Sequence, residues 1–336
     1  MPDALLALLV AGAVMVSLNA YVVLGGADFG GGVWDLLAAG PRRRRQRALI
    51  ADAIGPIWEA NHVWLILVVV LLFTCFPAVF SRVSVTLHIP LTLMLIGIVL
   101  RGSAFTFRTY DSQRDDVQRR WGAIFAGASI ITPVLLGVSI GAIAAGRVPP
   151  VPTGSFVAAY VAPWLTPFPF SVGVLTLVLF AFLAAVYLTL ESNDRDLQED
   201  FRRRGLAAGV IAFGAAALVL ALAQGEAPQV WQQLLGAPWA IVLHLATAIA
   251  AVSALWALWT RQWRLARAAA AAQVSCIVWG WGLAQYPYLL PPDLSYRDAA
   301  AAAVTLKLVL LVLAAGTFVL IPSLYYLFRI FKARPT

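Results

Sequence analysis

Long, uninterrupted runs of apolar residues dominate the pattern along the chain. A helix needs about 20 such residues to cross the hydrocarbon core of a bilayer, so the sequence predicts about nine membrane-spanning helices. We expect them near residues 4–24, 54–76, 83–101, 121–145, 165–190, 205–224, 238–259, 268–290 and 303–328. Prolines before the fifth span place its start near Phe168 to Ser171. The predicted fold class is an all-α, polytopic transmembrane helical bundle, with residues 1–336 in a single membrane-embedded domain.

The composition agrees with this interpretation and excludes others. Hydrophobic residues make up 61% of the 336 positions and charged residues 12%. Soluble domains are about half apolar and roughly a quarter charged, so an ordinary water-soluble globule is excluded. Intrinsic disorder needs low hydrophobicity and high charge, and a transmembrane barrel needs short alternating segments. Neither pattern occurs in this sequence.

The basic residues are distributed unevenly over the predicted loops. The odd-numbered loops and the C-terminal tail hold 19 of the 24 lysines and arginines. They are Arg42, Arg43, Arg44, Arg45, Arg47, Arg108, Arg114, Arg119, Arg120, Arg195, Arg202, Arg203, Arg204, Arg261, Arg264, Arg267, Arg329, Lys332 and Arg334. Cytoplasmic loops carry such an excess, so we expect these loops and the C-terminus in the cytoplasm and the N-terminus outside. This asymmetry explains most of the net charge of +8, and a nucleic-acid partner is not needed.

Four ionisable residues are predicted within or beside the membrane: Asp28 after the first span, Glu59 and His62 early in the second, and Arg101 at the end of the third. Ionisable groups at such positions are costly and are usually functional. The predicted topology places all four near the cytoplasmic face, with Glu59 about two turns into the membrane. Glu59 and His62 are three residues apart and share a helix face. Arg101 is placed to form an ion pair with Glu59 or Asp28.

Two interpretations of this cluster stay open. In the first, Glu59 exchanges protons with the cytoplasm, with Trp58 and Asn61 around it, and His62 relays a proton or donates a hydrogen bond. The cluster would then be a proton-uptake path. In the second, Arg101 and the carboxylates form a structural clamp that ties three helices together.

The glycine-rich segment at residues 24–32 follows the first span. A phosphate-binding loop would need a strand before it and a helix after it, whereas a membrane helix precedes this segment. Close helix packing and a flexible helix exit explain the glycines better.

Two functions of other classes are weighed as alternatives. His88 and His244 are predicted at similar depth on different helices, where two imidazoles could hold a haem b in an electron-transfer subunit. Alternatively, Glu59, His62 and Arg101 could form the substrate site of a secondary transporter. Transporters tend to have internal repeats and broken helices at mid-membrane. This polar cluster lies near one face, and we find no repeat, so the sequence disfavours a transporter.

Several motifs carry a resemblance to a known family. They are Ile-Gly-Pro-Ile-Trp-Glu-Ala-Asn-His-Val-Trp-Leu at 54–65, Arg-Gly-Ser-Ala-Phe-Thr-Phe-Arg at 101–108, Gly-Ala-Asp-Phe-Gly at 26–30, Trp-Leu-Thr-Pro-Phe at 164–168 and Ile-Pro-Ser-Leu-Tyr-Tyr at 321–326. This set resembles subunit II of cytochrome bd-type terminal oxidases, including their cyanide-insensitive branch. The matches follow the family's order from residue 20 to residue 330.

The resemblance implies a subunit of a membrane complex that oxidises quinol and reduces O₂ to water in aerobic respiration. The family's haems, b and d or b alone, lie in a partner, subunit I, so this chain would have no redox centre or metal of its own. It would support haem assembly and contribute to a proton path from the cytoplasm. The resemblance also implies a small single-helix accessory subunit in some complexes, a structural quinone in some members, and location in the bacterial cytoplasmic membrane.

The family's motifs also assign individual residues. Its acid after the tryptophan corresponds to Glu59, its motif aspartate to Asp28 and its arginine to Arg101. Trp58 would then pack near a quinone or a haem. The sequence departs from the best-known members at Gly25, where they have an acid, and at Glu59-Ala60-Asn61, where they have Asp-Gly-Asn. The cyanide-insensitive branch shares the Glu-Ala-Asn-His stretch.

Overall fold

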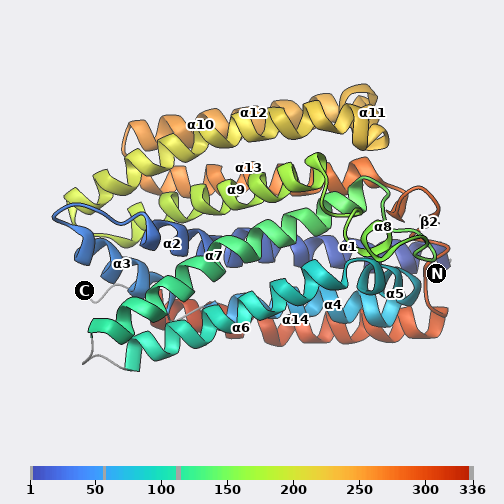
Figure 1. Ribbon diagram of the computed structural model, residues 1–336, viewed down its shortest axis with the longest axis horizontal. Helices are drawn as coiled ribbons and strands as arrows, with labels where there is room; N and C mark the ends of the chain where they lie inside the picture. The colour runs from blue at the N-terminus through green and yellow to red at the C-terminus, as the bar shows by residue number, and fades with distance from the viewer. Residues whose placement is uncertain (1–2, 56–57, 111–114, 333–336) are drawn as a thin grey trace.

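Helices that run along one common direction make up most of the molecule. The computed structural model describes residues 3–55, 58–110 and 115–332, drawn in Figure 1. The first long helix consists of α1 (Asp3–Ala20), a π-helical turn η1 (Tyr21–Gly25) and α2 (Gly26–Leu36). The other long helices are α4 (Trp58–Cys75), α6 (His88–Tyr110), α7 (Asp115–Ala144), α9 (Pro167–Glu191), α10 (Arg195–Glu226), α12 (Pro238–Trp259), α13 (Trp263–Gln285) and α14 (Ala303–Lys332).

Shorter elements connect the long helices at the two ends of the bundle. They are α3 (Arg43–Ile54), α5 (Pro77–Thr86), α8 (Phe156–Tyr160), α11 (Pro228–Gly236) and an antiparallel hairpin of β1 (Tyr288–Leu290) and β2 (Leu294–Ser295). Proline stands in the first turn of α5, α9, α11 and α12. In the first turn a backbone N–H has no acceptor within the helix, so proline, which lacks that N–H, loses no hydrogen bond there. These prolines therefore start helices rather than break them.

The predicted all-α transmembrane fold is confirmed. Among the residues that the structure describes, eight helical segments are long and apolar enough to cross a membrane. The predicted span near 268–290 is the one outside this set, and it corresponds to α13, whose many alanines and two glutamines make it less apolar. The first helix begins at one end of the bundle and α14 runs to the opposite end (Figure 1), as an odd number of crossings requires. Which end faces the cytoplasm stays a prediction.

Several element boundaries differ from those predicted, among them those of the first, third and sixth spans. The glycine-rich segment is not a helix exit, because the first helix continues through it as far as Leu36. The third crossing begins at His88, since α5 ends at Thr86. Helix α10 begins ten residues early, because the Asp194 side chain caps it by accepting a hydrogen bond of 2.9 Å from the backbone N–H of Asp196.

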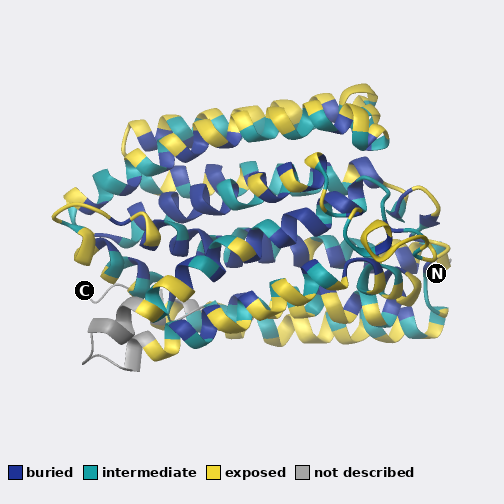
Figure 2. Cartoon of the chain, in the orientation of Figure 1, coloured by how far each residue is buried: buried dark blue, intermediate teal, exposed yellow. Residues whose placement is uncertain are grey.

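Helix α9 forms the centre of the bundle. About two thirds of its apolar window (67%) is buried inside the protein, against 6% for α14. It packs against α2, α7, α10 and α13, and Figure 2 shows the buried residues concentrated along the inner helices α2, α7, α9 and α13. Helix α14 lies at the edge and is largely exposed (Figure 2). Helix α2, by contrast, packs directly against the central helix α9, which fixes its position.

Glycines allow α2 to lie unusually close to α9. A Cβ added at Gly26 would fall 2.6 Å from the ring of Phe180, and one added at Gly30 would collide with the Phe180 backbone carbonyl. The indole N–H of Trp34 donates a hydrogen bond of 2.7 Å to the carbonyl of Ala181 across the same contact. The close helix packing expected from the glycine-rich segment is therefore confirmed.

Ion pairs join three of the arginine-rich segments at one end of the bundle. Arg42, before α3, makes two hydrogen bonds of 2.6 and 2.9 Å to Asp200 of α10, and Arg45 pairs with Asp194. Arg261, between α12 and α13, lies 3.4 Å from Glu199 of α10. The first, fifth and seventh loops therefore meet at the arginine-rich end. The side chains of Arg108, Arg119 and Lys332, and all of Arg114 and Arg334, lie outside the described part of the chain.

The α2–α9 contact gives a test of the fold. We expect Gly30→Ala to lower the free energy of unfolding by about 1–3 kcal/mol, because the added methyl group forces the two backbones apart. Gly12→Ala is the matched control, since nothing lies within 4 Å of its Cβ position. It should be neutral or stabilising by up to about 1 kcal/mol. Thermal unfolding of both variants in detergent measures the difference, and equal midpoints would contradict the close packing.

Candidate functional site

A buried arginine lies at the meeting point of α2, α6 and α7. Arg101 is 1% exposed, and its guanidinium carbon lies 4.7 Å from the ring centroid of Phe29 and 5.2 Å from that of Phe125. Its Nη2 donates a hydrogen bond of 2.8 Å to the backbone carbonyl of Asp28. The prediction placed Arg101 at the end of the third span. It lies instead well inside α6, because that helix continues beyond it.

Asp28 is the buried acid of the site. It is 5% exposed, and the Asn61 side chain of α4 donates a hydrogen bond of 2.8 Å to its Oδ2. The Asp28 carboxylate also interacts electrostatically with Arg101, so each buried charge compensates the other. Asp28 was expected after the first span, but it lies within the helix that continues from that span.

The structure does not bring Glu59 into this cluster. Helix α3 ends at Ile54 and α4 begins at Trp58, so Glu59 lies in the first turn of α4 rather than two turns inside a helix. Glu59 is exposed, whereas Asp28 and Arg101 are buried, and among the described residues no ion pair joins Glu59 to Arg101.

His62 lies in a group of aromatic rings beside the buried charges. Its ring centroid is 5.8 Å from Tyr21, 6.0 Å from Phe29 and 5.7 Å from Trp58. Within the described ranges, its buried Nδ1 and the Nε of Arg101 have no hydrogen-bond partner. Phe29 contacts both His62 and Arg101, so His62 lies beside the charged pair. The predicted role of His62 as a proton relay stays a prediction.

Trp58 joins α4 to α6. A Cβ added at Gly102 would lie 2.8 Å from Cη2 of the Trp58 indole. Glycine at 102 therefore leaves room for the indole to pack against α6 next to Arg101. This contact explains the position of Trp58 by packing, and the predicted contact with a quinone or haem stays a prediction.

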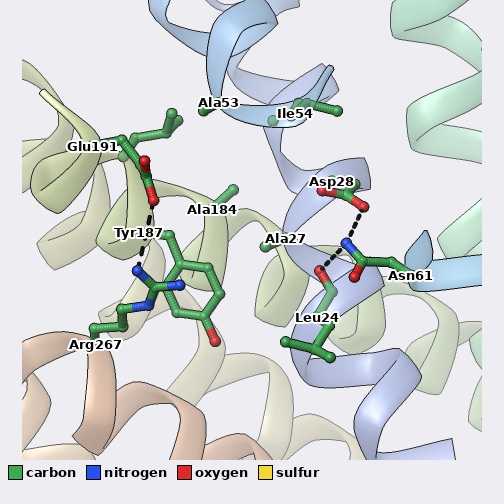
Figure 3. A pocket seen from close by; sticks show the side chains of 12 residues that line it. Leu24, Ala27, Asp28, Ala53, Ile54, Asn61, Ala184, Tyr187, Glu191 and Arg267 are labelled. Atoms are coloured by element: carbon green, nitrogen blue, oxygen red, sulfur yellow. Dashed lines mark hydrogen bonds and ion pairs between the residues drawn. The ribbon is translucent and has the colours of Figure 1, made fainter. Parts of the chain in front are cut away.

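A cavity of about 50 Å³ lies next to Asp28 and Asn61, as Figure 3 shows. On its far side are three residues that were not predicted as part of the site, namely Tyr187 and Glu191 of α9 and Arg267 of α13. Their signal in the sequence was weak, because Glu191 and Arg267 stand at helix ends among many other charges. Only the fold brings them to the same cavity as Asp28.

The haem alternative is not supported by the positions of its two histidines. Helices α6 and α12, which carry His88 and His244, lie on opposite sides of the bundle (Figure 1). A ring nitrogen of His88 lies 2.9 Å from the carbonyl of Val85, and one of His244 lies 2.8 Å from that of Leu234. Each histidine is therefore explained by a local hydrogen bond.

The fold and the site define a polytopic helical membrane protein with a compensated pair of buried charges towards its arginine-rich end. Comparison with known proteins then identifies the family. The family described as cytochrome bd terminal oxidase subunit II matches residues 6–331. The chain therefore belongs to this family.

Individual relatives are distant. Subunit 2 of the cytochrome bd ubiquinol oxidase of Bacillus subtilis (strain 168) is 27% identical over 183 residues, which cover 54% of this chain and 52% of that protein. The match thus spans about half the length of this relative. A second protein of the same strain, provisionally named a cytochrome bd menaquinol oxidase subunit II, is 21% identical over 328 residues, 93% of this chain and 91% of that protein.

A solved structure shows the same fold. A chain in the structure of the bd oxidase from Geobacillus thermodenitrificans superposes on this protein with a TM-score of 0.79 at 22% sequence identity. The superposition covers 98% of this chain and 99% of that chain. The bundle therefore has the fold of that chain over nearly its whole length.

The double contact of Arg101 with aromatic rings and a carbonyl predicts that lysine cannot replace it. A lysine lacks the planar fork that stacks on Phe29 and Phe125 while donating to Asp28. We expect Arg101→Lys to lower the free energy of unfolding by about 2 kcal/mol or more. Arg203→Lys is the control, because the Arg203 side chain is 76% exposed, and it should change stability by less than about 0.5 kcal/mol. Equal thermal midpoints for the two variants would contradict the role given to Arg101.

Proposed function

We propose that this chain is the non-haem subunit II of a complex that oxidises quinol and reduces O₂ to water, with a haem-bearing subunit I as its partner. Membership of the family over residues 6–331 supports this, as do relatives named as ubiquinol and menaquinol oxidase subunits. The haems, b and d or b alone, would supply electron transfer and O₂ reduction from the partner. In the described part of this chain, no group of three or more His, Cys, Asp or Glu residues could hold a metal.

The contribution proposed for this chain is a proton path to the partner. Reducing O₂ to water consumes protons as well as electrons, and the protons must reach a site inside the membrane. The observation that carries the proposal is the burial of Asp28 beside a cavity at the arginine-rich end. A carboxylate in such a position can accept and release a proton at its oxygen atoms.

The neighbours of Asp28 suit this role. Asn61 holds the carboxylate in one orientation through its hydrogen bond to Oδ2. Arg101 offsets the negative charge that remains when the proton leaves, which avoids the large cost of an isolated buried charge. His62 lies beside the charged pair, since both it and Arg101 contact Phe29, and its imidazole is a group that can relay a proton or donate a hydrogen bond.

We further propose that the arginine-rich end faces the cytoplasm of a bacterial cell and that the N-terminus lies outside. The excess of arginines in the loops at that end supports this orientation. In this orientation the cavity beside Asp28 lies towards the side from which the family draws its protons. A structural quinone, a small single-helix accessory subunit and a role in haem assembly remain part of the proposal through the family alone.

The secondary transporter is the weaker alternative. Its proposed site of Glu59, His62 and Arg101 is not assembled, because Glu59 is exposed whereas Arg101 is buried. The first helix contains a π-helical turn rather than a break, since η1 leads directly into α2. Membership of an oxidase family favours the proton path over a transport site as the role of the polar cluster.

Purification from native membranes tests the complex itself. The full chain, carrying an affinity tag, should bring down a second polytopic subunit together with a haem absorbance spectrum and quinol-dependent O₂ consumption. The apolar surfaces that the chain leaves exposed in isolation are consistent with such an assembly. Recovery of the chain without haem or oxidase activity, from membranes that retain activity, would contradict the proposal.

Substitution of the two acids tests the proton path within the assembled complex. We expect Asp28→Asn to lower turnover by about ten-fold or more, because it removes a group that can release a proton. Glu59→Gln should also slow turnover if the partner subunit covers Glu59 in the complex. The control is Asp52→Asn, since Asp52 is an exposed acid on α3 at the same end. All variants are compared at equal haem content.

The outcomes of this substitution experiment separate the two interpretations of the cluster. Normal turnover of Asp28→Asn in a fully assembled complex would reduce the Asp28–Arg101 pair to a structural clamp. Normal turnover of Glu59→Gln alone would remove Glu59 from the path and leave Asp28 in place.

A further inference from the structure

The cavity next to Asp28 is large enough for water. Its volume is about 50 Å³, and a buried water needs about 10–15 Å³ of such space together with two to four polar partners. The cavity wall supplies those partners from four helices, and small side chains keep the space open. The proposed role of Asp28 requires a route by which protons reach a buried acid.

The cavity has two polar sides (Figure 3). Asp28 and Asn61 form the inner side, joined by their 2.8 Å hydrogen bond. Glu191 and Arg267 form the outer side, with 3.6 Å between the carboxylate Oε1 of one and Nη1 of the other. The inner acid is 5% exposed, whereas the outer pair has side-chain exposures of 21% and 40%. The cavity therefore connects an acid that reaches solvent with one that does not.

The outer side lies at the arginine-rich end. Glu191 is the last residue of α9, and the segment that follows it carries Asp194, which pairs with Arg45. Tyr187, one helical turn before Glu191, lies beneath the guanidinium of Arg267 at 4.9 Å and donates a hydrogen bond of 3.2 Å to the carbonyl of Val23. This arrangement fixes Arg267 and Glu191 against the first helix.

Small side chains separate the two polar sides. Ala27 of α2 and Ala184 of α9 lie between them in Figure 3. Gly31, one turn after Ala27, also lines the cavity, and a Cβ there would collide with Ile54. A larger residue at Ala27 would occupy the space that connects the two acids.

We propose that Glu191 is the outer proton acceptor of the path to Asp28, and that water in the cavity carries the proton between them. A proton from the arginine-rich side binds the Glu191 carboxylate and then passes to the water. One proton leaves the inner end of the water chain for the Asp28 carboxylate, so Glu191 returns to its charged form. Arg267 and Tyr187 are positioning residues. The inference rests on the proposed function of Asp28.

Two substitutions in the assembled oxidase complex test this inference. Glu191→Gln removes the outer acid, and Ala27→Leu fills the cavity without changing any charge. Each should lower the maximal turnover by about ten-fold, increase the solvent deuterium isotope effect, and leave the KM for quinol unchanged. Glu191→Asp should restore most of the turnover because it retains a carboxylate. Haem content, measured from the absorbance spectrum, reports assembly of each variant.

Matched controls separate proton transfer from helix clamping. Glu226 has the same side-chain exposure of 21% and forms an ion pair of 2.9 Å with Arg147. Glu226→Gln therefore removes an equivalent charge that is not part of the cavity, and it should leave turnover unchanged. Ala27→Ser adds only a small polar group, and it should keep the path open. If Ala27→Leu fails to assemble, Glu191→Gln and its rescue by aspartate decide the question.

Asp28→Asn, measured in parallel, distinguishes the possible failures. Slow turnover in Asp28→Asn with normal turnover in both Glu191→Gln and Ala27→Leu would overturn the Glu191 path and leave the proposed function intact. Normal turnover in Asp28→Asn would overturn the proton role of Asp28 and this inference with it. Equal losses in Glu191→Gln and Glu226→Gln would show a structural effect and would also overturn the inference.

Discussion

The burial of one positive charge, that of Arg101, constrains the rest of the arginine-rich half of the bundle. A guanidinium that is 1% exposed inside a membrane protein is stable only where neighbouring groups compensate its charge and its hydrogen-bonding capacity. The Asp28 carbonyl and carboxylate and the rings of Phe29 and Phe125 provide that compensation. These groups come from α2 and α7, so three helices must keep a fixed relative position. The same requirement holds an acid in the interior, where it is available for chemistry.

The first helix meets this requirement through two features of its backbone. The π-helical turn at Tyr21–Gly25 adds a residue to one turn, and such an insertion rotates every later side chain around the helix axis. Asp28 and Phe29 thereby face α4 and α6. The glycines that follow let the same helix lie against the backbone of α9. Close packing on one face and a charged pair on the other are thus consequences of one short segment.

The sequence predicted the architecture well because long apolar runs depend on composition alone, and α12 spans the predicted residues, Pro238–Trp259. It predicted Asp28 and Arg101 as neighbours because buried charges require compensation. It misplaced Glu59, since the predicted second span begins near residue 54, whereas α3 ends there at Ile54 and α4 begins only at Trp58. It missed Glu191 and Arg267, because their pairing depends on the packing of α9 against α13. Periodicity in the sequence contains no information on which helices pack together.

The distribution of charge separates two kinds of role within one arginine-rich end. Arg42, Arg45 and Arg261 lie outside the apolar core, where they pair with acids of α10 and its N-cap and tie the loops together. Such pairs are replaceable, because each is partly exposed and solvent can substitute for either partner. Arg101 and Asp28 are both buried, so solvent cannot replace either partner of that pair. A charge retained in the interior despite its cost is therefore the best physical indication of function in this chain. The cavity supports the same conclusion, because an apolar core packed to the usual density would have closed it.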